Sequence, residues 1–379
     1  MADSDVTARR FEIFLDREVR ASSPLYVALT QYVSEDLAAG GYFTEVLARA
    51  PERQRIPNLL FASTQRVLFD HPNEALAEYY PSLGGSRQPD EQLTGAFAEF
   101  VAAHRAEIDP LLATGETQTN EVLRGAQLLP AFAWVQATMR RPLGLIEIGP
   151  SAGLLLHADR YDYRYEFTDG TIVEGGEASA DGVPPLHCPV HGDCTPQQLT
   201  PFVTKPLRVA SRVGLDLNPL NPTDPEARAW LRALVWPEHT ERRERLEAAL
   251  AHAARRPVRL RQGDALRILP DAVDSVADNA MPCVFVSNSL PHWTAEGRAE
   301  LVGLMRELGA RRDLVLILKE AHRIGLGLFS GAPDPVAVGG EDVHEVLGAA
   351  VYLGGRERLF RLGSAGMHGS WLDWAPRPL

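Results

Sequence analysis

The chain is poor in cysteine and lacks long apolar runs. Three cysteines in 379 residues are too few and too scattered for a disulfide framework in a chain of this size. The longest apolar runs, such as Leu314 to Leu318, are far shorter than the ~20 residues of a membrane-spanning helix. The N-terminal residues also lack the apolar core of a signal peptide. We therefore expect a soluble, cytoplasmic protein.

The chain also has fewer basic than acidic residues. The formal net charge is -12 at pH 7, which argues against broad binding to nucleic acid or to anionic membranes. A small-molecule substrate is the expected partner, whereas the sequence does not identify a protein partner. With 45% hydrophobic residues the chain can bury a sizeable core, and its length suggests two domains or one large one.

The chain has two successive parts that differ in their sequence pattern. Residues 1–135 show helical periodicity interrupted by proline and glycine, which predicts an N-terminal helical cap domain. In residues 136–379, apolar runs such as LGLIEIG, RVGLDLN, CVFVSNS and LVLILKE alternate with helical segments. This pattern predicts an α/β domain with a doubly wound, mostly parallel sheet. About residues 161–206 we expect an insertion with a β-hairpin turning at Asp169-Gly170.

The stretch LIEIGPSAGL, Leu145 to Leu154, has a strand-like run that enters a glycine-rich turn. Gly149 and Gly153 lack a β-carbon, so the backbone there can turn sharply and approach a ligand. A bulky residue at Gly149 is expected to exclude that ligand while leaving the fold largely intact. The spacing G-x-S-x-G also fits a hydrolase nucleophile elbow with Ser151 as the nucleophile. Glu147 has no role in a nucleophile elbow, so the hydrolase is the weaker interpretation.

Polar residues end the later strand-like runs. Asp216 could accept two hydrogen bonds from a ribose diol, and Asp264 one from the exocyclic amine of an adenine. Ser287 and Asn288 end a further run, at the edge where doubly wound sheets bind ligands. Each acid also has a simpler explanation, because Asp and Asn often cap the helix that follows a strand.

These residues resemble the successive motifs of class I S-adenosylmethionine-dependent methyltransferases. The matching stretches are EIGPSAG, GLDLNP, GDA and VSN. The resemblance implies a methyltransferase-like (Rossmann-like) fold and S-adenosylmethionine as the cofactor, bound by Glu147, Gly149, Ser151, Gly153, Asp216, Asp264, Ala265, Ser287 and Asn288. Two features depart from the pattern, namely a serine at position 151 where glycine is usual and about fifty residues between the first two motifs.

Over nearly its full length the chain more closely resembles an actinobacterial family, domain of unknown function 2332. The stretches that carry this resemblance are ETQTNEVLRGAQLLPAF, LDLNPLNPTDPEARAWLRALVWPE and HGSWLDW. The family name implies no activity of its own.

Four residues are candidates for the chemistry itself. Glu116 and Asn120 are expected on neighbouring turns of one helix together with Arg124, lining the roof of the site or forming a solvated face. His292 follows the last motif and is a candidate base, since its ordinary pKa lies near neutrality. His368, near the C-terminus, is a further candidate. His292 is equally explained as a loop residue before a helix.

The segment HCPVHGDC, His187 to Cys194, contains two cysteines and two histidines. These residue types bind zinc, but their spacing is not that of a compact zinc finger. We therefore expect no bound metal.

The leading functional hypothesis is methyl transfer from S-adenosylmethionine to a small molecule. A non-methylating enzyme on the same scaffold, catalysing ring closure or elimination, and an interaction protein without a cofactor remain open as alternatives.

Overall fold

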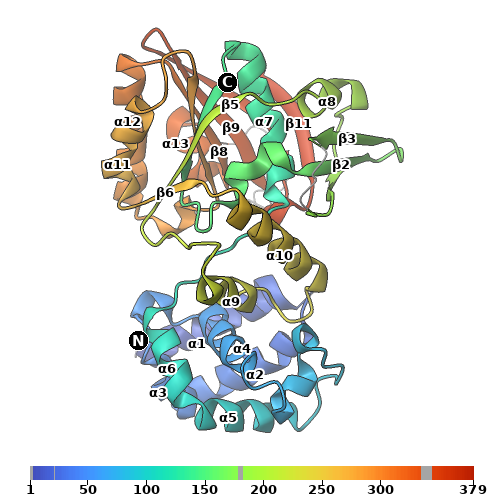
Figure 1. The fold of residues 1–379 in the computed structure, drawn as a ribbon. Helices are drawn as coiled ribbons and strands as arrows, with labels where there is room; N and C mark the ends of the chain where they lie inside the picture. The colour runs from blue at the N-terminus through green and yellow to red at the C-terminus, as the bar shows by residue number, and fades with distance from the viewer. Residues whose placement is uncertain (1–2, 21, 178–181, 334–343) are drawn as a thin grey trace. The chain divides into compact units, whose positions relative to one another are not determined.

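The computed structural model describes residues 3–20, 22–177, 182–333 and 344–379 (Figure 1). The chain divides into two compact units. Residues 1–119 and 224–247 form one, which we call the helical unit, and residues 120–223 and 248–379 form the other, the sheet unit. This division does not follow a single boundary near residue 135, because residues 120–135 group with the sheet and residues 224–247 with the helices.

The described residues of the helical unit form helices and loops and contain no strand. No helix in the described part of the chain is both long and apolar enough to cross a membrane. The helices of this unit are α1 (Asp3–Phe14), η1 (Leu15–Val19), α2 (Pro24–Ala38), α3 (Tyr42–Leu47), η2 (Glu52–Gln54), α4 (Pro57–Leu68), η3 (Ala75–Tyr79), η4 (Pro81–Leu83), α5 (Leu93–Ala103), α6 (Arg105–Thr114), α9 (Pro225–Ala233) and the first part of α10 (Thr240–Arg255).

Capping residues and aromatic packing stabilise these helices. Ser23 caps α2 by accepting a hydrogen bond from the amide of Tyr26, and Pro24 at the first helical position needs no hydrogen-bond partner for its nitrogen. Phe97 of α5 lies between Phe43 and Phe61, with ring centroids 5.4 and 6.0 Å away. The apolar stripes of α3, α4 and α5 thus share one core.

Buried polar contacts hold residues 224–247 in the helical unit. The side-chain amide of Gln65 donates to the carbonyls of Ala233 and Val235, both at 2.8 Å. The carboxylate of Glu238 accepts from the Ser23 hydroxyl, at 2.8 and 2.9 Å. Because these partners are more than 150 residues apart in sequence, local periodicity could not have predicted where this segment belongs.

The sheet unit is built on one eleven-stranded sheet in the order β3-β2-β4-β11-β10-β9-β8-β7-β1-β5-β6. It is mostly parallel, with β1, β5, β6, β7 and β8 forming a continuous parallel block. The strands are β1 (Leu143–Ile148), β2 (Asp162–Phe167), β3 (Ile172–Gly176), β4 (Leu186–Val190), β5 (Val209–Asp216), β6 (Arg259–Gln262), β7 (Met281–Ser287), β8 (Leu314–Glu320), β9 (Glu345–Leu353), β10 (Arg356–Ala365) and β11 (Leu372–Pro378).

Helices cover both faces of the parallel block, which explains why every residue of β1, β7 and β8 is buried. On one face, Val284 and Val286 of β7 share a core with the apolar residues of α11 and α12. Phe285 points to the other face and packs on Phe132 of α7, with ring centroids 5.0 Å apart. The helices of this unit are α7 (Arg124–Met139), η5 (Leu154–Arg160), α8 (Pro196–Val203), α11 (Ala265–Asp274), η6 (Leu290–His292), α12 (Ala295–Arg311), η7 (His322–Ile324), α13 (Leu326–Ser330) and η8 (Met367–Gly369).

The hairpin predicted around Asp169-Gly170 is present as β2 and β3, which pair antiparallel. Gly170 takes the left-handed conformation that its turn requires, with φ of 81°. The predicted insertion does not stand apart from the sheet, because β4 pairs with both β2 and β11. Residues 161–206 therefore extend the sheet at the end opposite β6.

Candidate functional site

The direction in which the chain winds reverses between β1 and β7. From β1 the chain adds β5 and then β6 on one side, and later β7 and β8 on the other. The crossover helices leave a crevice at the carboxyl ends of the strands at such a reversal, where open α/β sheets bind ligands. At this edge Gly149 follows β1. Ser287 is the last residue of β7, and Asn288 follows it.

The turn after β1 is held in an unusual backbone conformation. Gly149, Ser151 and Gly153 all have positive φ angles, of 72°, 51° and 73°. Serine adopts this region only at a cost. The amide of Ser151 donates to Asp216 Oδ2 at 2.8 Å, and the amide of Gly153 donates to the carbonyl of Pro150 at 2.8 Å. The acid that ends β5 therefore helps to hold the turn that ends β1.

The first glycine of this turn is needed by the protein itself. A β-carbon at Gly149 would lie 2.4 Å from the hydroxyl oxygen of Ser289 and 2.9 Å from its β-carbon. A bulky residue at Gly149 would therefore meet the Ser289 side chain and disturb the fold, contrary to expectation, whereas its effect on ligand binding stays a prediction.

Asn120 contacts the turn, but from a loop. The segment ETQTNEVLRG was expected to be one helix; instead α6 ends at Thr114, α7 begins at Arg124, and the residues between them are irregular. Asn120 donates to the hydroxyl of Ser151 at 2.9 Å and accepts from the amide of Ala152 at 3.4 Å. An amide cannot act as a general base, so this contact gives no support to Ser151 as a hydrolase nucleophile.

Glu116 does not share a helix with Asn120. It belongs to the helical unit, where its carboxylate pairs with Arg53 at 3.0 Å and its carbonyl accepts from the indole of Trp230 at 3.1 Å. The prediction that Glu116 and Asn120 share one helix is therefore wrong.

The two predicted cofactor acids differ in what they contact. Asp216 is half-buried and accepts from the amides of Ser151 and Asn218, both at 2.8 Å. Asp264 is exposed and caps α11 by accepting from the amide of Leu266 at 3.0 Å. Its neighbour Ala265 is buried in the core. Capping accounts for Asp264, whereas Asp216 joins two strand ends.

Arg124 connects α7 to the end of β7. Its guanidinium is buried and donates to the Ser287 carbonyl at 2.7 Å and to the Ser287 hydroxyl at 3.3 Å. Buried nearby, Glu147 is only 3% exposed. Burial raises the pKa of Glu147 to about 8, although the positive charge of Arg124 opposes this. The Oε2 atom of Glu147 accepts no hydrogen bond from the described residues.

A second buried group lies where β7, β8 and β9 meet. The Lys319 ammonium is fully buried and pairs with the carboxylate of Glu345. Asn288, whose φ is 56°, accepts from Lys319 at 3.3 Å and donates to Glu345. A non-glycine residue held in the left-handed region stores strain, which often marks functional sites.

Glu320 completes this buried group from the end of β8. One of its oxygens accepts from the amides of Ser289 and Leu290, at 2.9 and 3.1 Å. Burial raises the pKa of Glu320 to about 7. We call Arg124, Glu147, Lys319, Glu320 and Glu345 the buried charge cluster.

Sequence reasoning missed most of the buried charge cluster. Lys319 and Glu320 are the last residues of LVLILKE, so a charged pair ending an apolar run was the available signal. Glu345 begins β9 and carries no comparable signal. Only the neighbouring positions of β8 and β9 in the sheet bring Lys319 and Glu345 together.

The two predicted histidines lie on short helical turns. His292 is exposed on η6. His368 lies on η8 with φ of 55°, and a β-carbon on the adjacent Gly369 would lie 2.4 Å from Leu123, just before α7. The η8 turn therefore packs closely on the segment that leads into Arg124.

The HCPVHGDC segment does not gather its ligands around one point. His187 and Cys188 are successive residues of β4 and so point to opposite faces. His187 pairs with Glu166 at 2.7 Å, whereas Cys188 is buried. His191 stacks on Trp371, with ring centroids 5.2 Å apart. Among the described residues these side chains form no group of three ligand atoms.

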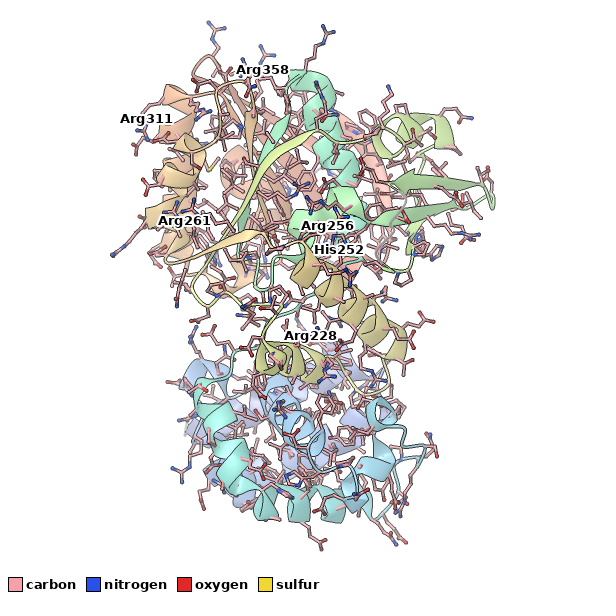
Figure 2. All side chains as sticks on the ribbon, viewed as in Figure 1. Arg228, His252, Arg256, Arg261, Arg311 and Arg358 are labelled. Carbon is pink, nitrogen blue, oxygen red and sulfur yellow. The ribbon has the colours of Figure 1, made fainter. Side chains whose placement is uncertain are left out.

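Two cavities lie in the sheet unit, and only the first of them is lined by a residue of the turn. One, of about 290 Å³, includes Ala152, Leu220 and Val258 in its lining. The other, of about 310 Å³, shares Val258 with it, and Figure 2 labels one of its arginines, Arg256. Four arginines line this second cavity, Arg160, Arg212, Arg256 and Arg259. Sequence reasoning anticipated neither cavity.

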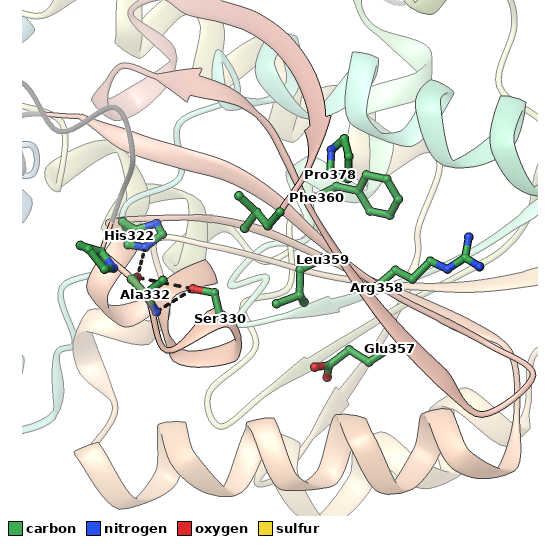
Figure 3. A pocket seen from close by; sticks show the side chains of 10 residues that line it. His322, Ser330, Ala332, Glu357, Arg358, Leu359, Phe360 and Pro378 are labelled. Carbon is green, nitrogen blue, oxygen red and sulfur yellow. Dashed lines mark hydrogen bonds between the residues drawn. The ribbon is translucent and has the colours of Figure 1, made fainter.

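A larger cavity of about 870 Å³ is lined by residues of α13, β10 and the C-terminus (Figure 3). Its lining includes His322, which donates to the carbonyl of Ala332 at 2.8 Å. Glu357, on the same lining, binds Arg306 at 3.0 Å. None of the predicted site residues lines this cavity.

The buried charge cluster predicts an unusual pH dependence of stability. Because the pKa of Glu147 is about 8 in the folded protein but near 4.3 for an unfolded glutamate, the folded state binds its proton more tightly. Glu147 therefore contributes stability that is fully present below about pH 4 and is lost as the pH rises towards 8. We expect Glu147→Gln to become increasingly stabilised relative to the unmodified protein between pH 5 and pH 9.

Urea unfolding of both proteins at several pH values measures this difference. Glu174→Gln, at an exposed position of β3, is the matched control and should show little such change. An equal pH dependence for the unmodified protein and Glu147→Gln would contradict the prediction.

Comparison with known proteins assigns the chain to a family. No curated protein matches it. A family model described as "Uncharacterized protein conserved in bacteria (DUF2332)" matches residues 8–374. The description extends the resemblance from actinobacteria to bacteria, and the methyltransferase resemblance rests on the motifs alone. Since the match covers nearly the whole length, the chain belongs to this bacterial family.

Proposed function

We propose that the sheet unit binds S-adenosylmethionine at the carboxyl ends of β1 and β5 and transfers its methyl group to a small molecule. The order β6-β5-β1-β7-β8, all parallel, is the arrangement expected of a methyltransferase-like domain. The antiparallel strands β9 and β10 then follow.

One contact carries the proposal. The amide of Ser151, in the glycine turn, lies 2.8 Å from Asp216 Oδ2 at the end of the neighbouring strand. A nucleoside cofactor bound at this edge needs such a turn for its charged end and such an acid for its ribose. Asp216 accepts two backbone amides, and a carboxylate has about four acceptor positions, so it retains capacity for ribose hydroxyls.

The charges also suit this cofactor. S-adenosylmethionine carries a sulfonium and an ammonium group, and Glu147 offers a buried oxygen with no hydrogen bond from the described residues. A buried carboxylate is stabilised in its ionised form by a bound cation. Leu217, beside Asp216, leaves 65% of its surface exposed and would provide an apolar surface for the adenine.

The bound cofactor would supply an electrophilic methyl group. The chain would hold the acceptor in line with it and remove a proton where the acceptor carries one. His292 remains the predicted base, with His368 as a further candidate. Glu320, with its pKa of about 7, is a buried group equally suited to that transfer.

Calorimetric titration with S-adenosylmethionine and S-adenosylhomocysteine tests the proposal. We expect both to bind, and Leu217→Ser to weaken binding by about tenfold, since lost burial of part of a leucine costs about 1.4 kcal/mol. Leu217 is exposed, so this change should leave the fold intact.

Ile172→Ser is the matched control, because Ile172 is 40% exposed and lies on β3 at the far end of the sheet. It should bind as the unmodified protein does. If neither ligand binds, or if Leu217→Ser binds with unchanged affinity, the proposed site is wrong.

A non-methylating enzyme on the same scaffold is the second candidate. It is favoured by the two buried carboxyl groups, Glu147 and Glu320, whose pKa values of about 8 and 7 suit proton transfer near neutral pH. Ring closure and elimination both need such groups. An interaction protein without a cofactor, the third alternative, has no use for them.

A further inference from the structure

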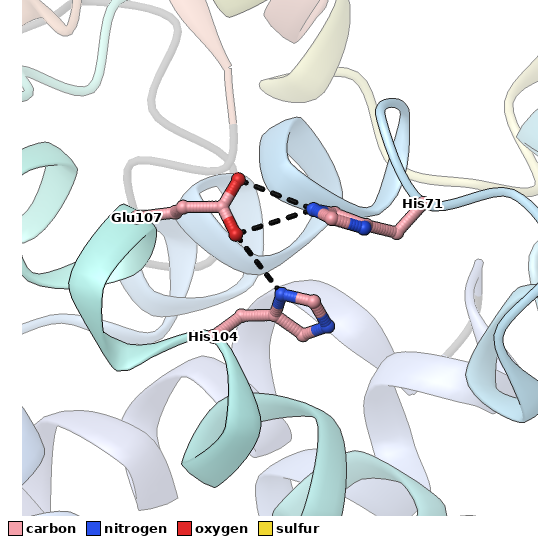
Figure 4. A group of neighbouring side chains, drawn as sticks. All are labelled: His71, His104 and Glu107. Carbon is pink, nitrogen blue, oxygen red and sulfur yellow. Dashed lines mark hydrogen bonds and ion pairs between the residues drawn. The ribbon is translucent and has the colours of Figure 1, made fainter.

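Three side chains meet on the surface of the helical unit, outside the site described above. His71 follows the end of α4, His104 lies between α5 and α6, and Glu107 is in the first turn of α6 (Figure 4). The Nε2 atom of His71 lies 3.1 Å from Glu107 Oε2, and the Nδ1 atom of His104 lies 3.0 Å from Glu107 Oε1. One ligand atom from each residue lies within 4.8 Å of those of the other two.

The spacing of these atoms fits a metal ion. Zinc is held at about 2.0–2.1 Å by imidazole nitrogens and carboxylate oxygens, so its ligand atoms in a tetrahedral site are about 3.3 Å apart. The nitrogen-to-oxygen distances of 3.0 and 3.1 Å need to open by only a few tenths of an ångström. Two histidines and one carboxylate are also a ligand set that zinc uses.

The surroundings supply the features of a metal site. The other ring nitrogen of His104, Nε2, faces Glu74 Oε1 at 3.6 Å, and metal-binding histidines commonly use their second nitrogen in this way. Phe100 packs on the His104 ring, with centroids 4.4 Å apart, which fixes its orientation. Glu107 is exposed and His71 is partly exposed, so an ion can reach the group from solvent.

We propose that the helical unit binds one divalent transition-metal ion, for which Zn²⁺ fits best, through His71 Nε2, His104 Nδ1 and the Glu107 carboxylate. The fourth position would be left to water. His71 and Glu107 are 36 residues apart, so the ion would tie the end of α4 to the junction of α5 and α6. Such a bond stabilises the folded form because the unfolded chain has no preformed site.

Zinc alone is the probe. After removal of metals with a chelator, the full-length protein is titrated with ZnCl₂ by calorimetry, and its zinc content after dialysis is measured by elemental analysis. We expect one ion per chain and slower hydrogen exchange around His71 and His104 on binding. His71→Ala and Glu107→Gln should abolish measurable binding, and Glu74→Gln should weaken it by about 10- to 100-fold.

His187→Ala is the matched control, because His187 also pairs with a carboxylate, Glu166 at 2.7 Å, but in the sheet unit. It should bind zinc normally, as should the variant with both Cys188 and Cys194 changed to serine. Circular dichroism checks that every variant is folded, and Glu107→Gln keeps the side-chain shape if His71→Ala is unstable. Absence of zinc from the unmodified protein, or zinc binding that survives both His71→Ala and Glu107→Gln, would refute the proposal.

Discussion

Replacing Lys319 by methionine is expected to destabilise the sheet unit by about 3–5 kcal/mol, the cost of leaving one partner of a buried ion pair uncompensated. Lys319 is completely buried and Glu345 nearly so. Removing the ammonium leaves the Glu345 carboxylate with Asn288 but without its direct ion-pair partner. Urea unfolding followed by hydrogen exchange of β8 and β9 measures the loss in this unit.

The matched second change is Glu345→Gln. Combined with Lys319→Met, it should recover a large part of the lost stability, because neither member of this pair is then left as a buried charge without the other. Arg141→Met is the surface control. Arg141 lies 3.7 Å from Asp313, both side chains are partly exposed, and breaking such a pair costs about 0–1 kcal/mol. A loss for Lys319→Met no greater than for Arg141→Met would show that the pair is not desolvated in solution.

Gly149→Ala is expected to destabilise the sheet unit by about 2–4 kcal/mol. About 1–2 kcal/mol comes from placing alanine at positive φ, and the rest from the overlap of the new β-carbon with Ser289. The added methyl group would lie 2.4 Å from the Ser289 hydroxyl. Thermal or urea unfolding measures the loss, and it should not depend on any ligand.

Two further variants separate the contributions. Adding Ser289→Gly removes the atoms that the methyl group meets, so the double variant should keep only the backbone cost. Gly170→Ala is the matched control, because Gly170 has φ of 81° and nothing within 4 Å of an added β-carbon. It should lose about 1–2 kcal/mol. Failure of Ser289→Gly to restore any stability to Gly149→Ala would contradict the steric explanation.

Much of the sheet could be predicted from local pattern. The runs at 143–148, 281–287 and 314–320 are mostly apolar, and they are buried strands of the parallel block. A strand covered on both faces cannot alternate polar and apolar residues, so its sequence is diagnostic. The sequence signal for the hairpin at Asp169-Gly170 was also local, because a turn residue with positive φ is usually glycine.

Local pattern failed where contacts distant in sequence accompany a different conformation. ETQTNEVLRG has helical spacing, but Asn120 binds Ser151 and Ala152 from a loop, and asparagine is a poor helix former. Asp264 caps α11, and its predicted contact with an adenine stays a prediction. Both functions use the same residue type at the same position.

The sequence by itself determined the strands β1, β5, β7 and β8, the β2–β3 hairpin, the helical content of the N-terminal residues, and the polar residues at the ends of β1, β5 and β7, because these depend on periodicity and on residues close together in the chain. Tertiary structure alone decided that residues 224–247 join the helical unit and that β4 joins the sheet. It also decided that Lys319 meets Glu345 and that His71 meets Glu107. Whether a charged residue becomes part of a buried ion pair or a metal site depends on which residue the fold places beside it. When that residue is distant in sequence, no local periodicity predicts the contact.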